Sequence, residues 1–200
     1  MFDVRSYAPH TYFGSNMYVV SSDNDCIVVD PSLPYSRSYL GDCRVKYVIL
    51  THAHFDHMIE LDSWISATGA PLLISRGDHS ALSDASRNCY RMFTGREGGY
   101  YGNAIEISDD DELILGEGSV RIMESPGHTP GSIALLFDTA AIVGDTVFAG
   151  GGYGRTDLPG GDPEALVASI RAILDLPGET TLYPGHGEPT TVMDYKKYLI

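Results

Sequence analysis

Short apolar runs separated by turn residues dominate the first half of the chain, and they predict β-strands. The runs cover residues 2–8, 17–21, 26–30 and 45–50. Turn residues such as Gly14-Ser15-Asn16 and Ser22-Asp23-Asn24-Asp25 separate the first three runs, which favours an antiparallel meander. The fourth run, Val45-Lys46-Tyr47-Val48-Ile49-Leu50, is apolar enough to predict a buried strand.

Further strands and three main helices are predicted along the rest of the chain. The strands cover residues 72–74, 113–115, 119–123, 132–137, 140–143 and 181–183. Helices are predicted at residues 57–68, ending at Gly69, from Asp162-Pro163 onward, and at residues 192–199, with a short helix after Pro34. Two strand-rich halves closed by helices predict an α/β (α+β) fold, with two sheets packed face to face and helices outside.

Residues 76–103 differ from the strand-rich segments around them. They are polar, mix helical and loop character, and end in a glycine- and tyrosine-rich stretch. Such an insertion is either an ordinary surface excursion or a cover for an active site.

Composition narrows the class of protein. With 200 residues and 43% hydrophobic content the chain can bury one sizeable core, so we expect a single domain over residues 1–200. The formal net charge of −14 opposes binding to nucleic acid or to an anionic membrane. The sequence shows neither a leader nor an apolar stretch of about 18 residues, which predicts a cytoplasmic protein. Cys26, Cys43 and Cys89 lack a Cys-x-x-Cys pairing, as expected of reduced thiols.

The stretch Thr51-His52-Ala53-His54-Phe55-Asp56-His57 concentrates metal-ligand residue types directly after a predicted buried strand. Alternate side chains of an extended segment share a face, so His52, His54 and Asp56 are expected to converge on one spot. His57 is out of phase and reaches the same cavity only if the backbone turns there. A chance or surface cluster is disfavoured, because three of only seven histidines fall within six positions. The stretch therefore predicts a metal site with room for two adjacent ions.

Three other strand ends carry a ligand residue type among glycines. These are His128 in Ser125-Pro126-Gly127-His128-Thr129-Pro130-Gly131, Asp145 in Gly144-Asp145-Thr146, and His186 in Tyr183-Pro184-Gly185-His186-Gly187. Each alone is typical of an ordinary turn. Together with the first cluster they supply the missing members of a closed set of ligands.

The order of these residues, from His52-x-His54-x-Asp56-His57 to His186, resembles the metallo-beta-lactamase superfamily. The runs at residues 127–132, 144–148, 154–158 and 184–187 are similar to its glyoxalase II-like (hydroxyacylglutathione hydrolase-like) branch. The resemblance covers about residues 16–191 and implies an αββα sandwich of two mixed sheets flanked by helices, with metals at one edge. The ligand sets that it implies are His52, His54 and His128 for a first metal, Asp56, His57 and His186 for a second, and Asp145 as the bridge.

The resemblance also implies a metallohydrolase. Imidazole and carboxylate ligands suit Zn(II), Fe(II) or Mn(II), and two zinc ions are our first expectation. A hydroxide held by the metals would attack the carbonyl carbon of a small-molecule thioester or related acyl bond, with Asp56 and Asp145 catalytic and Asp56 orienting the hydroxide. Arg155 lies near the place of a cation that contacts glutathione in glyoxalase II. It either binds a substrate carboxylate or pairs with Asp157.

Other functions share these residues and stay open. Persulfide dioxygenases are similar to this branch and use one Fe(II) held by two histidines and an aspartate, while related lactonases and esterases keep the ligand set. Glutathione recognition is not predicted, because glyoxalase II draws glutathione contacts from a C-terminal helical domain and only one short helix is predicted after His186. A non-catalytic metal-binding module is disfavoured because no ligand is lost, and a flavodiiron-type protein because His54 stands in place of its glutamate.

Two histidines lie outside the motifs. His10 and His79 are expected to be structural or exposed, although the position of His79 in the predicted cover would also allow it to touch substrate.

Overall fold

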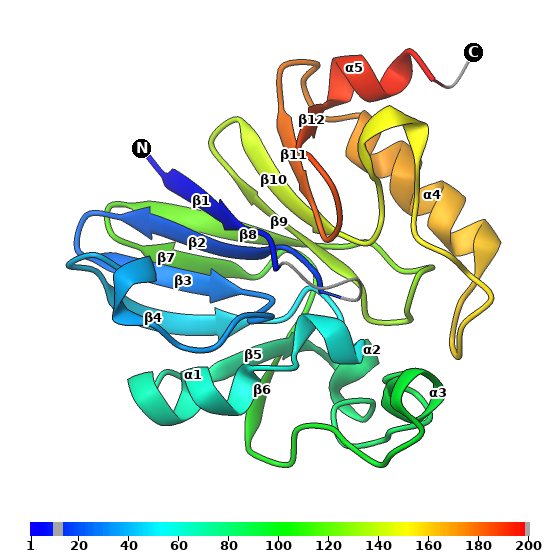
Figure 1. Ribbon diagram of the computed structural model, residues 1–200. Helices are drawn as coiled ribbons and strands as arrows, with labels where there is room; N and C mark the ends of the chain where they lie inside the picture. The colour runs from blue at the N-terminus through cyan, green and yellow to red at the C-terminus, as the bar shows by residue number, and fades with distance from the viewer. Residues whose placement is uncertain (10–13, 199–200) are drawn as a thin grey trace.

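The computed structural model describes residues 1–9 and 14–198, in which two six-stranded sheets lie face to face (Figure 1). The first sheet has the order β1 (Asp3–Tyr7), β2 (Met17–Ser22), β3 (Asp25–Val29), β4 (Arg44–Ile49), β5 (Leu72–Ser75) and β6 (Ala104–Ile107). Strands β1 to β3 form the predicted antiparallel meander, and β3 to β6 pair in parallel. The parallel strands end at the same edge of the sheet, where His52 and its neighbours follow β4.

The second sheet is mainly antiparallel. Its order is β12 (Thr190–Thr191), β11 (Thr181–Pro184), β10 (Ala140–Gly144), β9 (Ile133–Phe137), β8 (Gly118–Glu124) and β7 (Glu112–Leu115). Only β10 and β11 pair in parallel, so the segments after these two strands leave the sheet at one edge. Asp145 follows β10 and His186 follows β11, which brings both residues to that edge.

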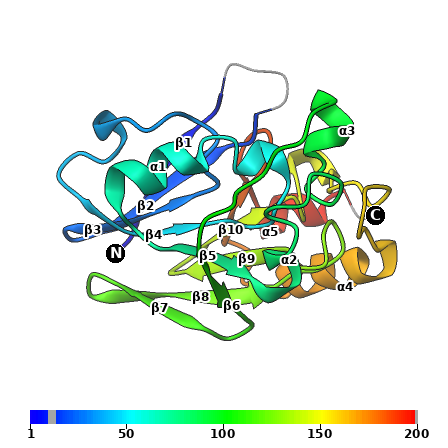
Figure 2. The same cartoon turned by 90° about the horizontal axis from the view of Figure 1, so that it is seen from below.

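Three apolar clusters define the four layers. The cluster between the sheets joins side chains of both, such as Ile27 and Ile49 with Ile122 and Leu135. A second cluster packs the outer face of the first sheet against α1 (Leu61–Thr68), whose Trp64 is fully buried. A third packs the second sheet against α4 (Pro163–Leu174) and α5 (Val192–Lys196). Figure 2 shows the same layers from below, and the predicted αββα sandwich is confirmed.

Helix α4 begins and helix α1 ends where the sequence chemistry predicts. Asp162 caps α4, since its side chain accepts hydrogen bonds from the backbone N–H groups of Glu164 and Ala165. Gly69 ends α1 in the left-handed conformation, with φ of 65°. The segment at residues 76–103 contains α2 (Arg76–His79) and α3 (Tyr90–Thr94).

Several local expectations were wrong. The helix expected at residues 57–68 is a 3-10 turn, η2 (Phe55–His57), followed by α1 from Leu61. The helix expected after Pro34 is only a 3-10 turn, η1 (Arg37–Tyr39), and another such turn is η3 (Ala149–Gly151). Strands β6 and β12 were not predicted, because β6 is mostly exposed and β12 has only two residues. The last helix, expected at residues 192–199, ends at Lys196, and residues 199 and 200 lie outside the described residues.

Within residues 1–9 and 14–198, every helix is too short or too polar to cross a lipid bilayer. Nothing in the two-sheet arrangement tests the single-domain organisation, which stays a prediction.

The N-cap of α4 makes a testable contribution to stability. Substituting Asp162→Ala leaves two N–H groups of the first helical turn without their acceptor, so the free energy of unfolding should fall by about 1 kcal/mol. Asp162→Asn keeps an acceptor oxygen and should retain most of that stability. Urea unfolding measures both variants, and equal stability of Asp162→Ala and the unaltered chain would contradict the assignment.

Candidate metal centre

Asp30 anchors the loop that leaves β4. It stands directly after β3, in the left-handed conformation with φ of 51°, and is fully buried. Its carboxylate accepts hydrogen bonds from Thr51 N and Thr51 Oγ1, both at 2.7 Å, and its Oδ2 lies 2.8 Å from His57 Nδ1. One buried carboxylate therefore fixes both the start of the loop and the ring of His57.

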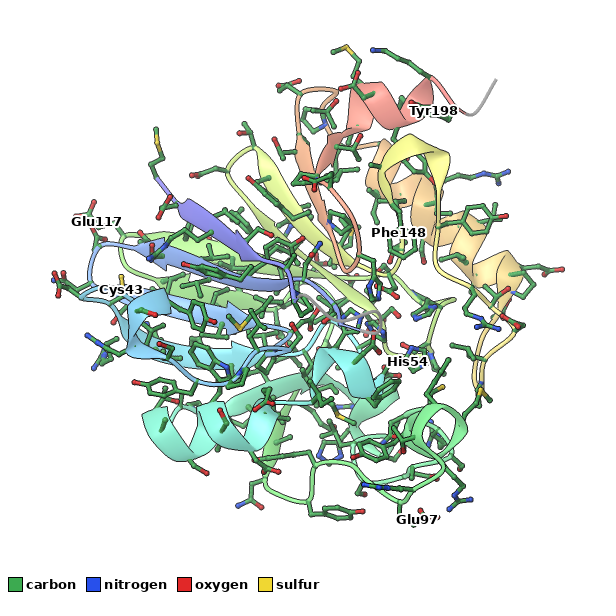
Figure 3. All side chains as sticks on the ribbon, in the orientation of Figure 1. Cys43, His54, Glu97, Glu117, Phe148 and Tyr198 are labelled. Carbon is green, nitrogen blue, oxygen red and sulfur yellow. The ribbon has the colours of Figure 1, made fainter. Side chains whose placement is uncertain are left out.

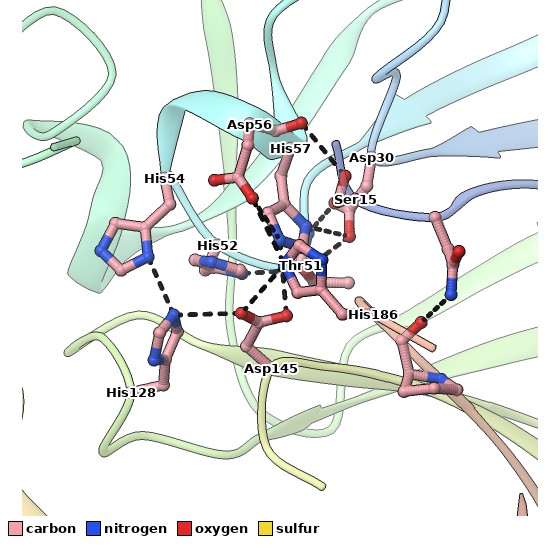
Figure 4. A network of polar contacts seen from close by, with 12 residues as sticks. Ser15, Asp30, Thr51, His52, His54, Asp56, His57, His128, Asp145 and His186 are labelled. Atoms are coloured by element: carbon pink, nitrogen blue, oxygen red, sulfur yellow. Dashed lines mark hydrogen bonds and ion pairs between the residues drawn. The ribbon is translucent and has the colours of Figure 1, made fainter. Parts of the chain in front are cut away.

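The loop does not stay extended over its full length, which corrects the expectation of three ligands on one face. His54 has extended backbone angles, and the 3-10 turn η2 follows it. His52 and His54 group with His128, whereas Asp56 and His57 group with His186, although the His52 and His57 rings remain close, with centroids 4.1 Å apart (Figure 4). The backbone turn that was needed to bring His57 into the same cavity is present, but it changes the direction of the Asp56 side chain as well.

The first group consists of His52, His54 and His128, whose nearest ring nitrogens all lie within 4.8 Å of one another. His54 Nδ1 is 2.8 Å from His128 Nε2. The outer nitrogen of His128 contacts the carbonyl oxygen of Arg155 at 2.8 Å, and His52 Nδ1 lies 3.1 Å from Thr51 Oγ1. These outer contacts leave the Nε2 atoms of His52 and His128 directed toward the centre.

The second group consists of Asp56, His57 and His186, also with donor atoms within 4.8 Å. Asp56 Oδ2 is 3.3 Å from His186 Nε2 and 3.8 Å from His57 Nε2. His57 is fully buried, whereas the His186 side chain is 38% exposed, so this group opens toward solvent through His186.

Asp145 lies between the two groups. Its Oδ1 is 3.4 Å from His57 Nε2, while its Oδ2 is 3.4 Å from His128 Nε2 and 3.5 Å from His186 Nε2. Its Oδ2 thus lies near one ring of each group and its Oδ1 near another ring of the second group, so the carboxylate contacts both groups. The structure thus brings all seven predicted residues together, and their role as ligands stays a prediction.

Unpaired polar atoms show that this space suits cations. His52 Nε2, His57 Nε2 and Asp145 Oδ1 are buried without a hydrogen-bond partner among the described residues, and these three residues form a further group of close donors. His54 Nε2 is also unpaired. Buried polar atoms are costly when left without a partner, and nitrogen and oxygen donors of this kind are what divalent transition metals bind. The residues present therefore fit a metal centre.

The protonation states of His52, His54 and Asp145 also fit metal binding. Burial and, to a smaller extent, the charges of the neighbouring histidine rings lower the pKa of His52 well below its usual range. Burial and the nearby His128 ring lower the pKa of His54 to about 3. Burial alone would raise the pKa of Asp145, but His57 and the other nearby imidazoles hold it below its usual range. Neutral imidazole and ionised carboxylate are the forms that coordinate metals.

His57 differs from the other buried rings. Burial opposes its protonation, but the carboxylates of Asp30, Asp56 and Asp145 outweigh burial and raise the pKa of His57. A proton on His57 would compete with a cation for the same buried, acidic surroundings.

Asp78 joins the two loops that carry the first group. Its Oδ2 accepts hydrogen bonds from Ala53 N and Thr129 Oγ1, and its Oδ1 accepts one from Gly131 N, all at 2.8 Å. Asp78 is 1% exposed, so these bonds are shielded from water. It fixes the loop of His54 against the loop of His128 without contacting either ring.

The loop of His186 is held from the other sheet. Asn16 Nδ2 donates to the carbonyl oxygens of Pro184 and Gly187 at 3.0 and 2.8 Å, and Tyr18 OH donates to the same Pro184 oxygen. Gly185 packs so closely on Asp145 that a Cβ atom would collide with the Asp145 carboxylate. Glycine is therefore required between Pro184 and His186.

Sequence reasoning missed the supporting carboxylates Asp30 and Asp78. Neither lies in a recognisable motif, and the only signal for Asp30 was its position at the end of an apolar strand-like run. Both roles arise from contacts between loops that are distant in sequence, which spacing along one chain does not reveal.

The other predicted residues have more peripheral places. Arg155 pairs with Asp157 through two contacts, Nε to Oδ1 at 2.7 Å and Nη2 to Oδ2 at 2.5 Å, and it also lines the cavity at the metal centre. The predicted internal pairing is therefore present. His79 lies 3.6 Å from Glu106 and does not line that cavity, and His10 lies outside the described residues.

A cavity of about 340 Å³ opens on the cluster. Its polar lining includes His54, Asp56, His128, Asp145 and His186, and Cys89 and Phe93 reach it from the segment at residues 76–103. Figure 3 labels two of its lining residues, His54 and Phe148. That segment thus contributes to the wall of the cavity, while its action as a cover stays a prediction.

An αββα sandwich with a histidine and aspartate cluster at the sheet edge defines a class of metal-binding proteins. The family model of the Metallo-beta-lactamase superfamily matches residues 10–186, and the chain belongs to this superfamily. The probable metallo-hydrolase YqgX of Bacillus subtilis is 35% identical over 186 residues, a match that covers 90% of this chain and 88% of YqgX. The hydroxyacylglutathione hydrolase of Anaeromyxobacter dehalogenans is 31% identical over 191 residues, which cover 93% of this chain and 65% of that enzyme.

Solved structures show the same architecture. The crystal structure of the BLEG-1 B3 metallo-beta-lactamase superposes with a TM-score of 0.87 and 29% identity, covering 98% of this chain and 97% of that one. TTHA1623 in a di-iron-bound form superposes with a TM-score of 0.84 and 26% identity, covering 97% and 98% of the two chains. The fold expected from the sequence resemblance is confirmed by these neighbours.

The role of Asp30 can be tested by metal affinity. Asp30→Ala removes the carboxylate that orients His57, and loss of such an outer contact should lower Zn(II) affinity about 10- to 100-fold. The buried Thr51 N–H also loses its acceptor, which should lower the free energy of unfolding of the metal-free protein by about 1–3 kcal/mol. Chelator competition and urea unfolding measure the two effects.

The matched control is Asp42→Ala, which removes an exposed carboxylate just before β4, the strand whose other end leads to Thr51. Its zinc affinity should equal that of the unaltered chain. Equal affinity in Asp30→Ala would show that His57 needs no support from Asp30.

Proposed function

We propose that this chain is a metal-dependent hydrolase that cleaves a thioester or related acyl bond. The observation that carries the proposal is the pair of adjacent donor groups joined by Asp145 at the base of an open cavity. A structural metal site is normally closed to solvent, whereas a catalytic site keeps an open side for substrate. The exposed face of His186 and the cavity above it favour the catalytic case.

In this proposal two divalent metals occupy the two groups. His52, His54 and His128 would hold one, Asp56, His57 and His186 the other, and Asp145 would contact both. When bound, such metals supply Lewis acidity for a carbonyl oxygen and generate a nucleophile from water near neutral pH. Zinc is our first choice for this donor set, and the di-iron form of the structural neighbour TTHA1623 supports iron as the alternative.

The chain's own residues then have distinct tasks. Thr51, Asp30 and the Arg155 carbonyl contact the outer nitrogens of His52, His57 and His128, which fixes the ring orientations. Asp145 holds the two groups of ligands at a fixed separation, because its Oδ1 faces the His57 ring and its Oδ2 faces the His128 ring. Asp56 has a side chain 17% exposed at the cavity and orients the attacking water by accepting a hydrogen bond from it.

Similarity to a hydroxyacylglutathione hydrolase favours a thioester among the acyl substrates. Similarity to YqgX, a probable metallo-hydrolase, supports hydrolysis more generally. Lactones and esters present the same carbonyl chemistry. The strongly negative charge supports a small-molecule substrate over nucleic acid or an anionic membrane, and the three free cysteines support a reducing, cytoplasmic location.

The central experiment compares Asp145→Ala with the unaltered protein. Loss of the shared carboxylate should reduce bound metal below one equivalent and lower thioester kcat/KM by roughly 100-fold or more. Metal analysis of protein purified without added metal and a panel of thioester, lactone and persulfide substrates provide the readouts. The matched control, Asp175→Ala, removes an exposed carboxylate at the end of α4 and should change neither.

Two results would overturn the proposal. Full hydrolysis by metal-free protein would exclude metal-dependent chemistry. One bound iron with oxygen uptake on a persulfide, and no hydrolysis, would assign the chain to the dioxygenase alternative.

A further inference from the structure

One side of the cavity at the metal centre is apolar. The cavity lining includes three phenylalanines, a tyrosine, a leucine and a cysteine, which we call the apolar wall. Its members are Phe55, Cys89, Phe93, Phe148, Tyr153 and Leu158. None of these residues belongs to the seven candidate ligands, so the wall requires a separate explanation.

The wall is fixed by packing. Phe55, Cys89 and Leu158 form a buried cluster, and the ring of Phe93 stacks on Phe55 with centroids 5.5 Å apart. Phe55 N donates to the carbonyl oxygen of Asn88 at 2.9 Å. Asn88 is itself buried, and its side chain bonds to the carbonyl oxygens of Leu82 and Gly98. An apolar group can therefore bind to a surface that already exists.

The wall begins next to the metal centre. Phe55 lies between His54 and Asp56 in the chain, and the Phe148 ring centroid is 6.0 Å from that of His186. A chain attached to a carbonyl carbon at the centre would therefore reach the wall with its first few atoms. The cavity volume, about 340 Å³, is at the small end of the range for ligand sites, so the wall suits a short group.

Charge away from the metal centre disfavours an anionic acyl group. Apart from the histidines of the metal centre, Arg155 is the one basic side chain among the described lining residues, and its guanidinium already pairs with Asp157. A substrate with additional carboxylates would have to displace Asp157 from Arg155, whereas a neutral group meets only the apolar wall.

We propose that the substrate's acyl group is short, neutral and apolar, and that the wall formed by Phe55, Phe93 and Leu158 selects it. This inference rests on the proposed function and identifies the substrate class of the same cavity. Removing apolar surface from water favours binding by a roughly constant amount per methylene, so affinity should rise with chain length until the cavity is full.

The first test measures binding and does not depend on turnover. Straight-chain carboxylates from acetate to octanoate represent the acyl product, and calorimetry gives the Kd of each for the zinc-loaded protein. Affinity should rise about two- to fourfold for each added methylene and then level off. A Kd that does not change with chain length would overturn the inference.

The second test uses neutral thioesters that share one leaving group and carry acetyl to octanoyl chains. The kcat/KM should rise along the series in the same way, and the lactoyl thioester of the same leaving group should be a poorer substrate than the hexanoyl compound. If kcat/KM does not change along the acyl series, the assignment of the wall to the acyl side is wrong.

Variants of α3 test whether the apolar wall causes the dependence of Kd and kcat/KM on acyl chain length. Phe93→Ala removes a partly exposed ring that lines the cavity and should flatten the chain-length dependence in both tests, while Phe93→Leu should keep most of it. Met92→Ala alters the exposed neighbour on the same helix, which does not line the cavity, and should behave like the unaltered chain. An unchanged dependence in Phe93→Ala would overturn the role of the wall.

The two proposals fail in different ways. Protein that hydrolyses none of the thioesters, yet binds longer carboxylates more tightly, would refute hydrolysis and keep the apolar site. Protein that hydrolyses all thioesters equally, and binds all carboxylates equally, would keep the hydrolase and refute the apolar acyl group.

Discussion

The burial of unpaired imidazole and carboxylate atoms around one space is the constraint on which the rest of the structure depends. Seven polar side chains from four loops meet there, and several of their donor atoms have no partner among the described residues. Leaving such atoms buried and unsatisfied is costly, and the ionised carboxylates would repel one another. Divalent cations between these atoms would remove both costs, and this is the physical reason for proposing a metal centre at the edge of an apolar sandwich.

The sandwich supplies the rigidity that this centre needs. Parallel strands bring the loops after β3 and β4 to one sheet edge, and the pairing of β10 with β11 does the same in the other sheet. Buried carboxylates then connect loop to loop: Asp30 holds Thr51 and His57, and Asp78 holds Ala53 to Thr129 and Gly131. The candidate ligands thus depend on contacts that form only when both sheets have closed.

Sequence patterns predicted the fold well, and the places of the site residues in part. Most strands, the cap at Asp162 and the C-terminal glycine of α1 follow local rules, so they could be placed from the sequence. The 3-10 turn that moves Asp56 to the side of His186 could not, because an extended and a turned loop fit the same residues. Asp30, Asp78 and the apolar wall also escaped prediction, since each depends on segments that meet only in three dimensions. Motif order predicts the seven candidate ligands, and the structure brings all seven together.

The most direct test of the central claim is a crystal structure of the metal-loaded protein, with diffraction recorded on both sides of the absorption edge of the metal. We expect two adjacent anomalous peaks, one among His52, His54 and His128, the other among Asp56, His57 and His186, with Asp145 contacting both. Anomalous peaks only at other residues, or none in protein that retains its full hydrolytic activity, would contradict a metal centre formed by these residues.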